Sequence, residues 1–442
     1  MTRPSVAIVT LGCARNEVDS EELAADLAHD GWELVDDPQQ ADTVLVNTCG
    51  FIEAAKRDSI DTVLQMADLP GKVVAVGCMA ERYGATLQET LPEADAVLGF
   101  DAYPQLPTAL RKVLAGEHLP SLTPHDRRHL QPAAPSERSG ELTVLPGHIG
   151  VRRRLSDGPV ASVKLASGCD RRCTFCAIPS FRGAYVSRRP ADIVNEVAWL
   201  AEQGVLEVNL VSENSTSYGK DLGDLRLLES LLPELAATPG LERIRVAYLQ
   251  PAEMRPDLIR VIGTTVGVAP YFDLSFQHAS PAVLRRMRRF GGSDDFLALI
   301  DRIREVNPMA AIRSNVIVGF PGETPQDVDV LVDFLGRAQL DFVGVFAYSD
   351  EEGTEAVAFP DHVDPDEVDM RVDLIADVAD EVMAQRAAAR VGESVRVIVE
   401  AGASQFQGPE DGSTHLRGAS PEPVVVARVV DSDGADLVAE PA

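Results

Sequence analysis

Apolar runs alternate with helical patterns along the first 115 residues. Residues 5–10, 43–46 and 73–76 are apolar enough to form strands that are buried on both faces. Between them, residues 21–30 and 51–66 repeat apolar positions at the spacing of a helix turn. Strand, helix and strand in this order predict a parallel, doubly wound sheet.

The same alternation returns after residue 160 and continues to about residue 348. Helical patterns such as residues 190–203 and 325–338 separate the apolar runs. Six strand–helix repeats predict a partial (β/α)6 barrel, curved but not closed to eight strands. The expected strands are residues 162–166, 207–211, 243–247, 272–276, 312–318 and 342–348.

Beyond the barrel, residues 366–389 predict one long helix, and strand patterns separated by Gly-rich turns then indicate a small all-β module. The Pro-rich stretch at residues 116–159 breaks the pattern and predicts a linker, with a short hairpin at residues 144–154. The fold class is therefore α/β with a C-terminal all-β module. Its strands are expected at residues 394–400, 424–430 and 436–439, and the domains at residues 4–115, 155–386 and 387–442, with a linker at 116–154.

Composition narrows the class of protein. Hydrophobic residues make up 45% and charged residues 25%, which is typical of globular proteins. No apolar run approaches the roughly 18–20 residues that span a bilayer, and the N-terminus lacks a signal peptide, so we expect a cytoplasmic protein without membrane contact.

The net charge is −29, from 40 basic and 69 acidic residues. Such a chain repels nucleic acid unless a basic face overrides the total, so we expect nucleic-acid contact not to dominate. A basic protein partner suits this charge, although solubility alone explains it equally well.

Three cysteines lie close together after the strand expected at residues 162–166. Cys169, Cys173 and Cys176 have the spacing C-x-x-x-C-x-x-C. Three thiolates each bind one iron of a 4Fe–4S cluster, and the absence of a nearby fourth cysteine leaves one iron open for a ligand. A zinc site usually has four protein ligands and an electron-transfer cluster a fourth cysteine, so the spacing favours the open-iron cluster.

The other three cysteines are far apart in sequence but share a context. Cys13, Cys49 and Cys78 each follow an expected strand of the first sheet. Parallel strands end at one sheet edge, so the three thiolates converge there and predict a second cluster. The alternative is three buried thiols that end strands by chance.

The central motif, with Phe175 before the last cysteine, resembles the radical S-adenosylmethionine (SAM) superfamily. That resemblance implies that the open iron binds SAM and that its reductive cleavage gives a 5′-deoxyadenosyl radical, which abstracts a hydrogen atom from the substrate. An electron donor such as flavodoxin or ferredoxin is then required.

The N-terminal region resembles the methylthiotransferase family, whose members carry a second 4Fe–4S cluster. The matching stretches are Thr10-Leu11-Gly12-Cys13, Asn47-Thr48-Cys49-Gly50 and Gly77-Cys78; Ala14-Arg15 departs from the Pro-Lys usual in the family. The resemblance implies that one SAM methylates a sulfur at the second cluster. A second SAM supplies the radical, and the substrate carbon radical collects the methylthio group.

Two branches of the family differ in substrate. One modifies an adenosine of transfer RNA, and the RimO branch modifies the β-carbon of an aspartate in ribosomal small-subunit protein twelve. Residues 176–183, Gln277-His278-Ala279-Ser280-Pro281 and the Glu351-Glu352 pair resemble the RimO branch. A basic ribosomal protein, free or on the ribosome, is the partner that this implies. The C-terminal module resembles a TRAM domain, yet residues 393–442 carry three basic and nine acidic residues.

The resemblance also points to residues around SAM. Glu213 or Asn214 is expected to bind its amino group, Arg313 its carboxylate, and Gly319 its adenine, while His278 is a candidate proton carrier. A turn cap, an ion pair or a structural histidine remain alternatives for these residues. The rival functions are a transfer-RNA methylthiotransferase, a non-catalytic iron–sulfur scaffold and a zinc-binding interaction protein.

Overall fold

The computed structural model describes residues 3–120, 122–129, 152–399, 405–407, 413–418 and 422–442. Residues 144–151 of the expected hairpin lie outside them.

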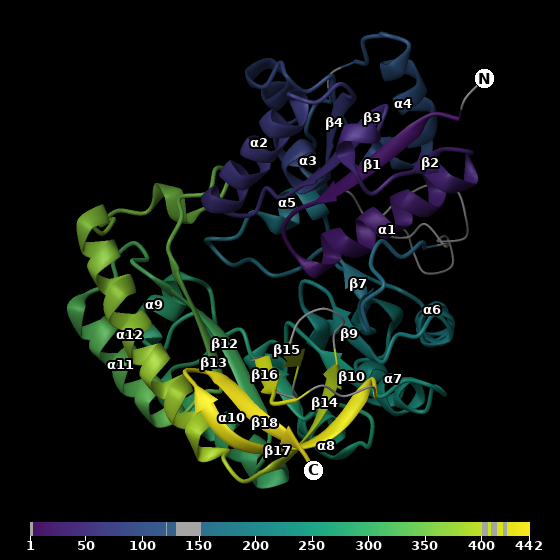
Figure 1. The fold of residues 1–442 in the computed structure, drawn as a ribbon. Helices are drawn as coiled ribbons and strands as arrows, with labels where there is room; N and C mark the ends of the chain where they lie inside the picture. The colour runs from purple at the N-terminus through teal and green to yellow at the C-terminus, as the bar shows by residue number, and fades with distance from the viewer. Residues whose placement is uncertain (1–2, 121, 130–151, 400–404, 408–412, 419–421) are drawn as a thin grey trace.

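The N-terminal domain is a five-stranded parallel sheet with helices on both faces, as predicted (Figure 1). The strand order is β2-β1-β3-β4-β5. Helices α1 (Ala14–His29) and α4 (Leu106–Leu114) pack on one face, and α2 (Glu53–Ala67) and α3 (Gly77–Thr90) on the other. The strands are β1 (Ser5–Thr10), β2 (Glu33–Leu34), β3 (Thr43–Thr48), β4 (Lys72–Val76) and β5 (Ala96–Val97).

The central domain is a curved assembly of six parallel strands in two three-stranded sheets, β10-β9-β6 and β11-β12-β13. A backbone bridge between Leu249 and Leu274 joins the two sheets, so the predicted partial barrel is confirmed. The strands are β6 (Val160–Lys164), β9 (Glu207–Val211), β10 (Arg243–Val246), β11 (Tyr271–Asp273), β12 (Ala311–Val318) and β13 (Phe342–Ala347). The outer helices are α6 (Pro190–Glu202), α7 (Leu227–Ala236), α8 (Pro256–Thr264), α10 (Ser293–Val306) and α11 (Pro325–Ala338).

Strand β11 is shorter than the expected strand at residues 272–276. Beyond Asp273 the chain makes only isolated bridges, and Gln277 has a φ of +72°, which ends regular pairing.

The C-terminal module is a small closed β-barrel that packs against the long helix α12 (Pro365–Ala389). Arg396 pairs with Glu242 at the amino end of β10, so the module lies away from the barrel mouth. The sequence patterns missed β15 and β16, because each has only three or four residues in a Gly-rich stretch. The strands are β14 (Ser394–Val399), β15 (Gln405–Gln407), β16 (Ser413–Leu416), β17 (Val424–Asp433) and β18 (Asp436–Pro441).

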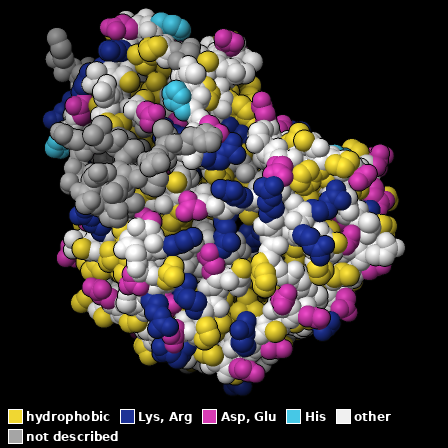
Figure 2. Space-filling model, turned by 180° about the vertical axis from the view of Figure 1, so that it is seen from behind, with side chains coloured by type: hydrophobic (Ala, Val, Ile, Leu, Met, Phe, Trp, Pro, Cys, Tyr) yellow, Lys and Arg dark blue, Asp and Glu magenta, His cyan; other side chains and the backbone are white. Residues whose placement is uncertain are grey.

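The N-terminal domain lies over the carboxyl ends of the barrel strands (Figure 1). The short helix α5 (Ile178–Arg182) follows the central cysteine motif and packs Ala177 and Phe181 into the core of the N-terminal domain. Despite the net charge, Lys and Arg side chains gather across the middle of one face (Figure 2). None of the described helices is both long and apolar enough to cross a bilayer.

Candidate active site

The three N-terminal cysteines lie together at the carboxyl edge of the first sheet. Asn16 connects their segments, because its amide donates to Leu11 O (2.9 Å) and Thr48 O (3.3 Å) while its Oδ1 lies 3.7 Å from Cys78 Sγ. Gly12 has a φ of +92°, and a Cβ there would meet Cys49 Sγ at 2.9 Å. Only glycine therefore lets the Cys13 loop approach Cys49 this closely. The structure thus brings the segments of Cys13, Cys49 and Cys78 to one edge of the sheet, and their binding of a cluster stays a prediction.

Two buried guanidinium groups contact this trio. Arg182 donates to Cys78 Sγ from Nη2 (3.1 Å) and Nε (3.4 Å), and Arg15 Nη2 lies 3.7 Å from Cys13 Sγ. Burial raises the pKa of Cys78 to about 11, an increase that Arg182 opposes. Burial also acts to raise the pKa of Cys13, but Arg15 and Arg182 outweigh it, and the pKa is lowered. The site thus compensates negative charge on the sulfurs.

The central trio lies on the loop between β7 (Ala166–Ser167) and α5. The Cys169 N–H donates to Gly183 O (3.0 Å), the Cys176 N–H donates to Cys173 O (3.2 Å), and the Arg171 N–H donates to Cys169 Sγ (3.4 Å). These bonds fold the loop back on itself and bring the three thiols to the barrel mouth.

Glu213 and Arg15 connect the two trios. Arg15 Nη1 lies 2.8 Å from Glu213 Oε1, and Arg182 Nε lies 3.9 Å from the same oxygen. Burial raises the pKa of Cys169 to about 12; the Arg171 N–H opposes this increase, and the Glu213 carboxylate adds to it. The Glu213 side chain therefore lies between the trios.

Asn214, the alternative to Glu213, has its amide engaged within its own loop. Its Nδ2 donates to Ser217 Oγ (2.8 Å) and Glu253 Oε2 (3.0 Å), and its Oδ1 accepts from the Thr216 hydroxyl. Glu253 also pairs with Arg171 of the cysteine loop. The geometry therefore favours Glu213, and Asn214 positions the loop.

Arg313 and Gly319 both have structural partners. Arg313 Nη1 lies 3.3 Å from Asp273 Oδ1, which matches the ion-pair alternative. Gly319 has a φ of +82°, and a Cβ there would lie 2.6 Å from Val368 Cγ2, so glycine allows α12 to pack closely. A role of either residue toward SAM stays a prediction.

The surroundings of His278 match the structural alternative rather than a proton carrier. Its side chain is fully buried. Nδ1 accepts the Ser280 N–H (2.9 Å), and Nε2 lies 3.3 Å from Glu323 Oε2, which also accepts from Gly319 N–H. Both ring nitrogens therefore face protein groups, and a role of His278 in proton transfer stays a prediction.

Glu351, from the pair typical of the RimO branch, connects the barrel to the N-terminal domain. Its Oε2 lies 2.8 Å from Arg82 Nη1 and 3.1 Å from Lys56 Nζ. Arg82 also donates to Gly50 O (2.8 Å), next to Cys49. Glu351 therefore holds the Cys49 loop against the barrel.

We expect Glu351→Ala to lower the free energy of unfolding by about 1–3 kcal/mol, because it removes buried bonds to two cations. Urea unfolding of the apoprotein measures this change. Glu352→Ala is the matched control, because the Glu352 side chain is exposed. Equal effects of the two substitutions would contradict the role of Glu351.

The residues fit iron–sulfur clusters and an amino-group ligand. No group of three or more His, Cys, Asp or Glu side chains among the described residues is arranged to hold a single metal ion. A cluster instead takes each thiolate on a different iron, and each trio supplies three thiols. Glu213 Oε2 and Arg182 Nη1 are buried without a hydrogen-bond partner in the described part of the chain, and they suit an ammonium group and an anionic cluster, respectively.

Sequence reasoning missed Arg182, Arg15 and Tyr248 as members of the site. Arg15 Cζ lies 5.7 Å from the Tyr248 ring centre, and Tyr248 has a φ of +60°, rare for a non-glycine residue. The unusual Ala14-Arg15 pair was the available signal for Arg15. Nothing local marks Arg182, whose partners are distant in sequence.

Comparisons with known proteins agree with this site. The family model "Uncharacterized protein family UPF0004" matches residues 5–99, and that of the radical SAM superfamily matches residues 163–335. Curated relatives include the "ribosomal protein uS12 methylthiotransferase RimO" of Nocardioides sp., 59% identical over 99% of this chain and 97% of that protein, and that of Kineococcus radiotolerans, 57% identical over 100% and 98%. The chain belongs to the RimO methylthiotransferase family. As a RimO-family member it is a radical SAM transferase that uses SAM and iron–sulfur chemistry.

A solved structure shares the fold of this RimO-family chain. The radical SAM methyltransferase TsrM of Kitasatospora setae has a TM-score of 0.55 over 78% of this chain and 73% of its own, at 17% identity. At this identity the match supports the arrangement of the domains and says nothing of the substrate.

Proposed function

We propose that this chain adds a methylthio group to the β-carbon of an aspartate in ribosomal protein uS12, with two 4Fe–4S clusters bound at its two cysteine trios. The observation that carries the proposal is the bridge of Arg15 and Glu213 between the trios. It brings the residues that would hold the two clusters to a common site under the N-terminal domain. The names of the relatives, which match this chain over nearly the full length of both proteins, support uS12 as the substrate.

Each group of residues has a role in this proposal. Cys169, Cys173 and Cys176 would hold the cluster that binds SAM, and Cys13, Cys49 and Cys78 the second. When bound, these groups supply a carbon-centred radical and a methylthio group. Glu213 accepts the ammonium of SAM, because its Oε2 is a buried oxygen without a partner among the described residues.

A radical is required for a chemical reason. The aspartate β-carbon has no proton acidic enough for a side-chain base, so acid–base catalysis does not reach it. The site accordingly places Arg15, Arg182 and Glu213 around the sulfurs rather than a histidine base. The candidate histidine, His278, is buried away from them. Cys49 and Cys78 are buried, whereas the other four cysteines are partly exposed, which leaves room for SAM and a substrate beside them.

The acidic C-terminal module of this chain argues against transfer RNA as the substrate. Residues 393–442 carry three basic and nine acidic residues, whereas phosphate contacts need Lys and Arg. A basic ribosomal protein matches this charge better.

The test is anaerobic reaction of the reconstituted protein with SAM, sulfide and reductant, offered purified uS12, small ribosomal subunits or transfer RNA. We expect peptide mass spectrometry to find one aspartate of uS12 carrying a methylthio group in place of hydrogen. Modification of transfer RNA with unmodified uS12 would contradict the proposal.

A further inference from the structure

An arginine-rich segment lies directly beside the central cysteine loop. It follows α9 (Pro281–Arg286) and runs through residues 285–290, Arg-Arg-Met-Arg-Arg-Phe. The Thr174 N–H donates to Met287 O (3.2 Å), and the Thr174 hydroxyl donates to Arg286 O (2.9 Å). Arg289 Nη1 lies 3.7 Å from Cys173 Sγ, so the segment contacts one sulfur of the central trio.

The outer side of this segment is exposed and basic. Arg172, Arg285 and Arg288 are exposed, and the Phe290 side chain is 66% exposed. Arg288 pairs with Glu355 (2.7 Å), whereas Arg172 and Arg285 have no ion-pair partner among the described residues. We call these three arginines, with Arg289 and Phe290, the arginine face.

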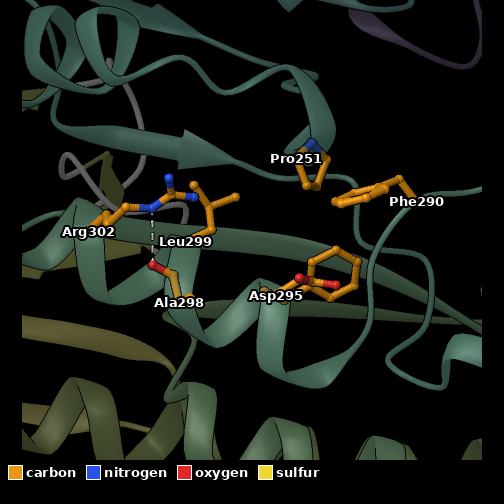
Figure 3. Close-up of a pocket in the computed structure, with 7 residues that line it drawn as sticks. Pro251, Phe290, Asp295, Ala298, Leu299 and Arg302 are labelled. Atoms are coloured by element: carbon orange, nitrogen blue, oxygen red, sulfur yellow. Dashed lines mark hydrogen bonds between the residues drawn. The ribbon is translucent and has the colours of Figure 1, made fainter.

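A shallow hollow adjoins the arginine face. Its volume is about 420 Å³, and Phe290 and Pro251 lie opposite helix α10, from which Asp295 and Leu299 project (Figure 3). An exposed aromatic ring among arginines is typical of the residues that dominate protein–protein binding. The location beside Cys173 indicates a partner that acts on the central trio.

We propose that the arginine face docks an acidic protein that carries a single electron, of the flavodoxin or ferredoxin class. The inference rests on the proposed function, since the radical chemistry consumes one electron per SAM cleaved. The carrier is oxidised by one electron and the cluster at Cys169, Cys173 and Cys176 is reduced by one, with no bond formed or broken. Arg289 and Cys173 provide a short path for the electron from the arginine face to this cluster.

Charge explains why this face is needed. The chain carries a net charge of −29, so an acidic carrier is repelled by most of its surface. A local basic surface steers the carrier to the sulfurs, as charge complementarity does in other encounters. An RNA partner fits less well, because the arginine face lies beside Cys173 and an RNA has no electron to deliver to a cluster there.

The test compares two reductants on the reconstituted protein. The variant combines Arg172→Glu, Arg285→Glu and Arg288→Glu. The matched control combines Arg226→Glu, Arg260→Glu and Arg337→Glu, at exposed arginines away from the arginine face. Stopped-flow absorbance follows cluster bleaching by reduced flavodoxin and by dithionite. We expect the flavodoxin rate of the variant to fall at least about tenfold and to lose its salt dependence. Its dithionite rate falls far less, because a small reductant needs no docking surface, and both control rates stay unchanged.

A second variant separates charge from contact. Phe290→Ser should lower the rate of cluster reduction by flavodoxin. The rate with dithionite and the salt dependence of the flavodoxin rate should not change. An unchanged flavodoxin rate in both variants would overturn the proposal, as would equal slowing with dithionite. Binding of an RNA oligonucleotide that is lost in the triple variant while flavodoxin still reduces normally would assign the face to RNA. No readout requires uS12, so failure of the substrate assignment stays distinguishable.

Discussion

Joint replacement of Cys13, Cys49 and Cys78 by alanine should abolish methylthio transfer while SAM is still cleaved to 5′-deoxyadenosine. The central trio keeps its own backbone bonds, such as Cys169 N–H to Gly183 O, and Glu213 remains in place. In the proposed function the lost trio would hold the sulfur that is transferred, so the radical would then have no methylthio group to collect. Liquid chromatography of the nucleoside and mass spectrometry of uS12 measure the two outcomes separately.

The matched variant replaces Cys169, Cys173 and Cys176, and it should lose both products. Transfer that persists in the N-terminal triple variant would contradict the assignment of the two trios. Loss of cleavage in that variant would show that the trios do not act separately.

Replacement of Arg182 by methionine should destabilise the apoprotein by about 3–5 kcal/mol, since it leaves buried charge uncompensated. Arg182 Nη2 lies 3.1 Å from Asp19 Oδ2 and donates to Asn16 Oδ1 (2.9 Å), and both side chains of the ion pair are 1% exposed. Lys164 also pairs with Asp19, so one cation remains where two were present. The result should appear as a lower midpoint in urea, with the N-terminal domain losing hydrogen-exchange protection first.

Arg226→Met is the control for this experiment. Arg226 is 73% exposed and pairs only at the surface with Asp257, so its loss should be close to neutral. Equal stability of the two variants would show that Arg182 does not hold the domains together.

The placement of the six cysteines could be predicted from the sequence, because each position depends on a local rule. Cys49 and Cys78 directly follow apolar strands, and parallel strands end at one edge. The C-x-x-x-C-x-x-C spacing needs no tertiary information. In the order β2-β1-β3-β4-β5, the connections run in opposite directions from β1 and from β3, and this opens a crevice at the strand ends beside Cys13 and Cys49.

The cations of the site could not be predicted in this way. Arg182 reaches Cys78 across 104 positions of the sequence, and Arg82 reaches Glu351 across 269. Such contacts depend on how the two domains pack, which no periodicity reveals. The burial of His278 could not be predicted for the same reason, because a polar residue at a strand end faces the mouth or the core according to how the chain packs there.

Iron and acid-labile sulfide quantitation on the anaerobically reconstituted protein tests the central claim most directly. Two four-iron clusters predict about eight irons per chain, and about four in either triple-alanine variant. About four irons in the unaltered protein, or zinc in their place, would contradict two clusters at these six cysteines.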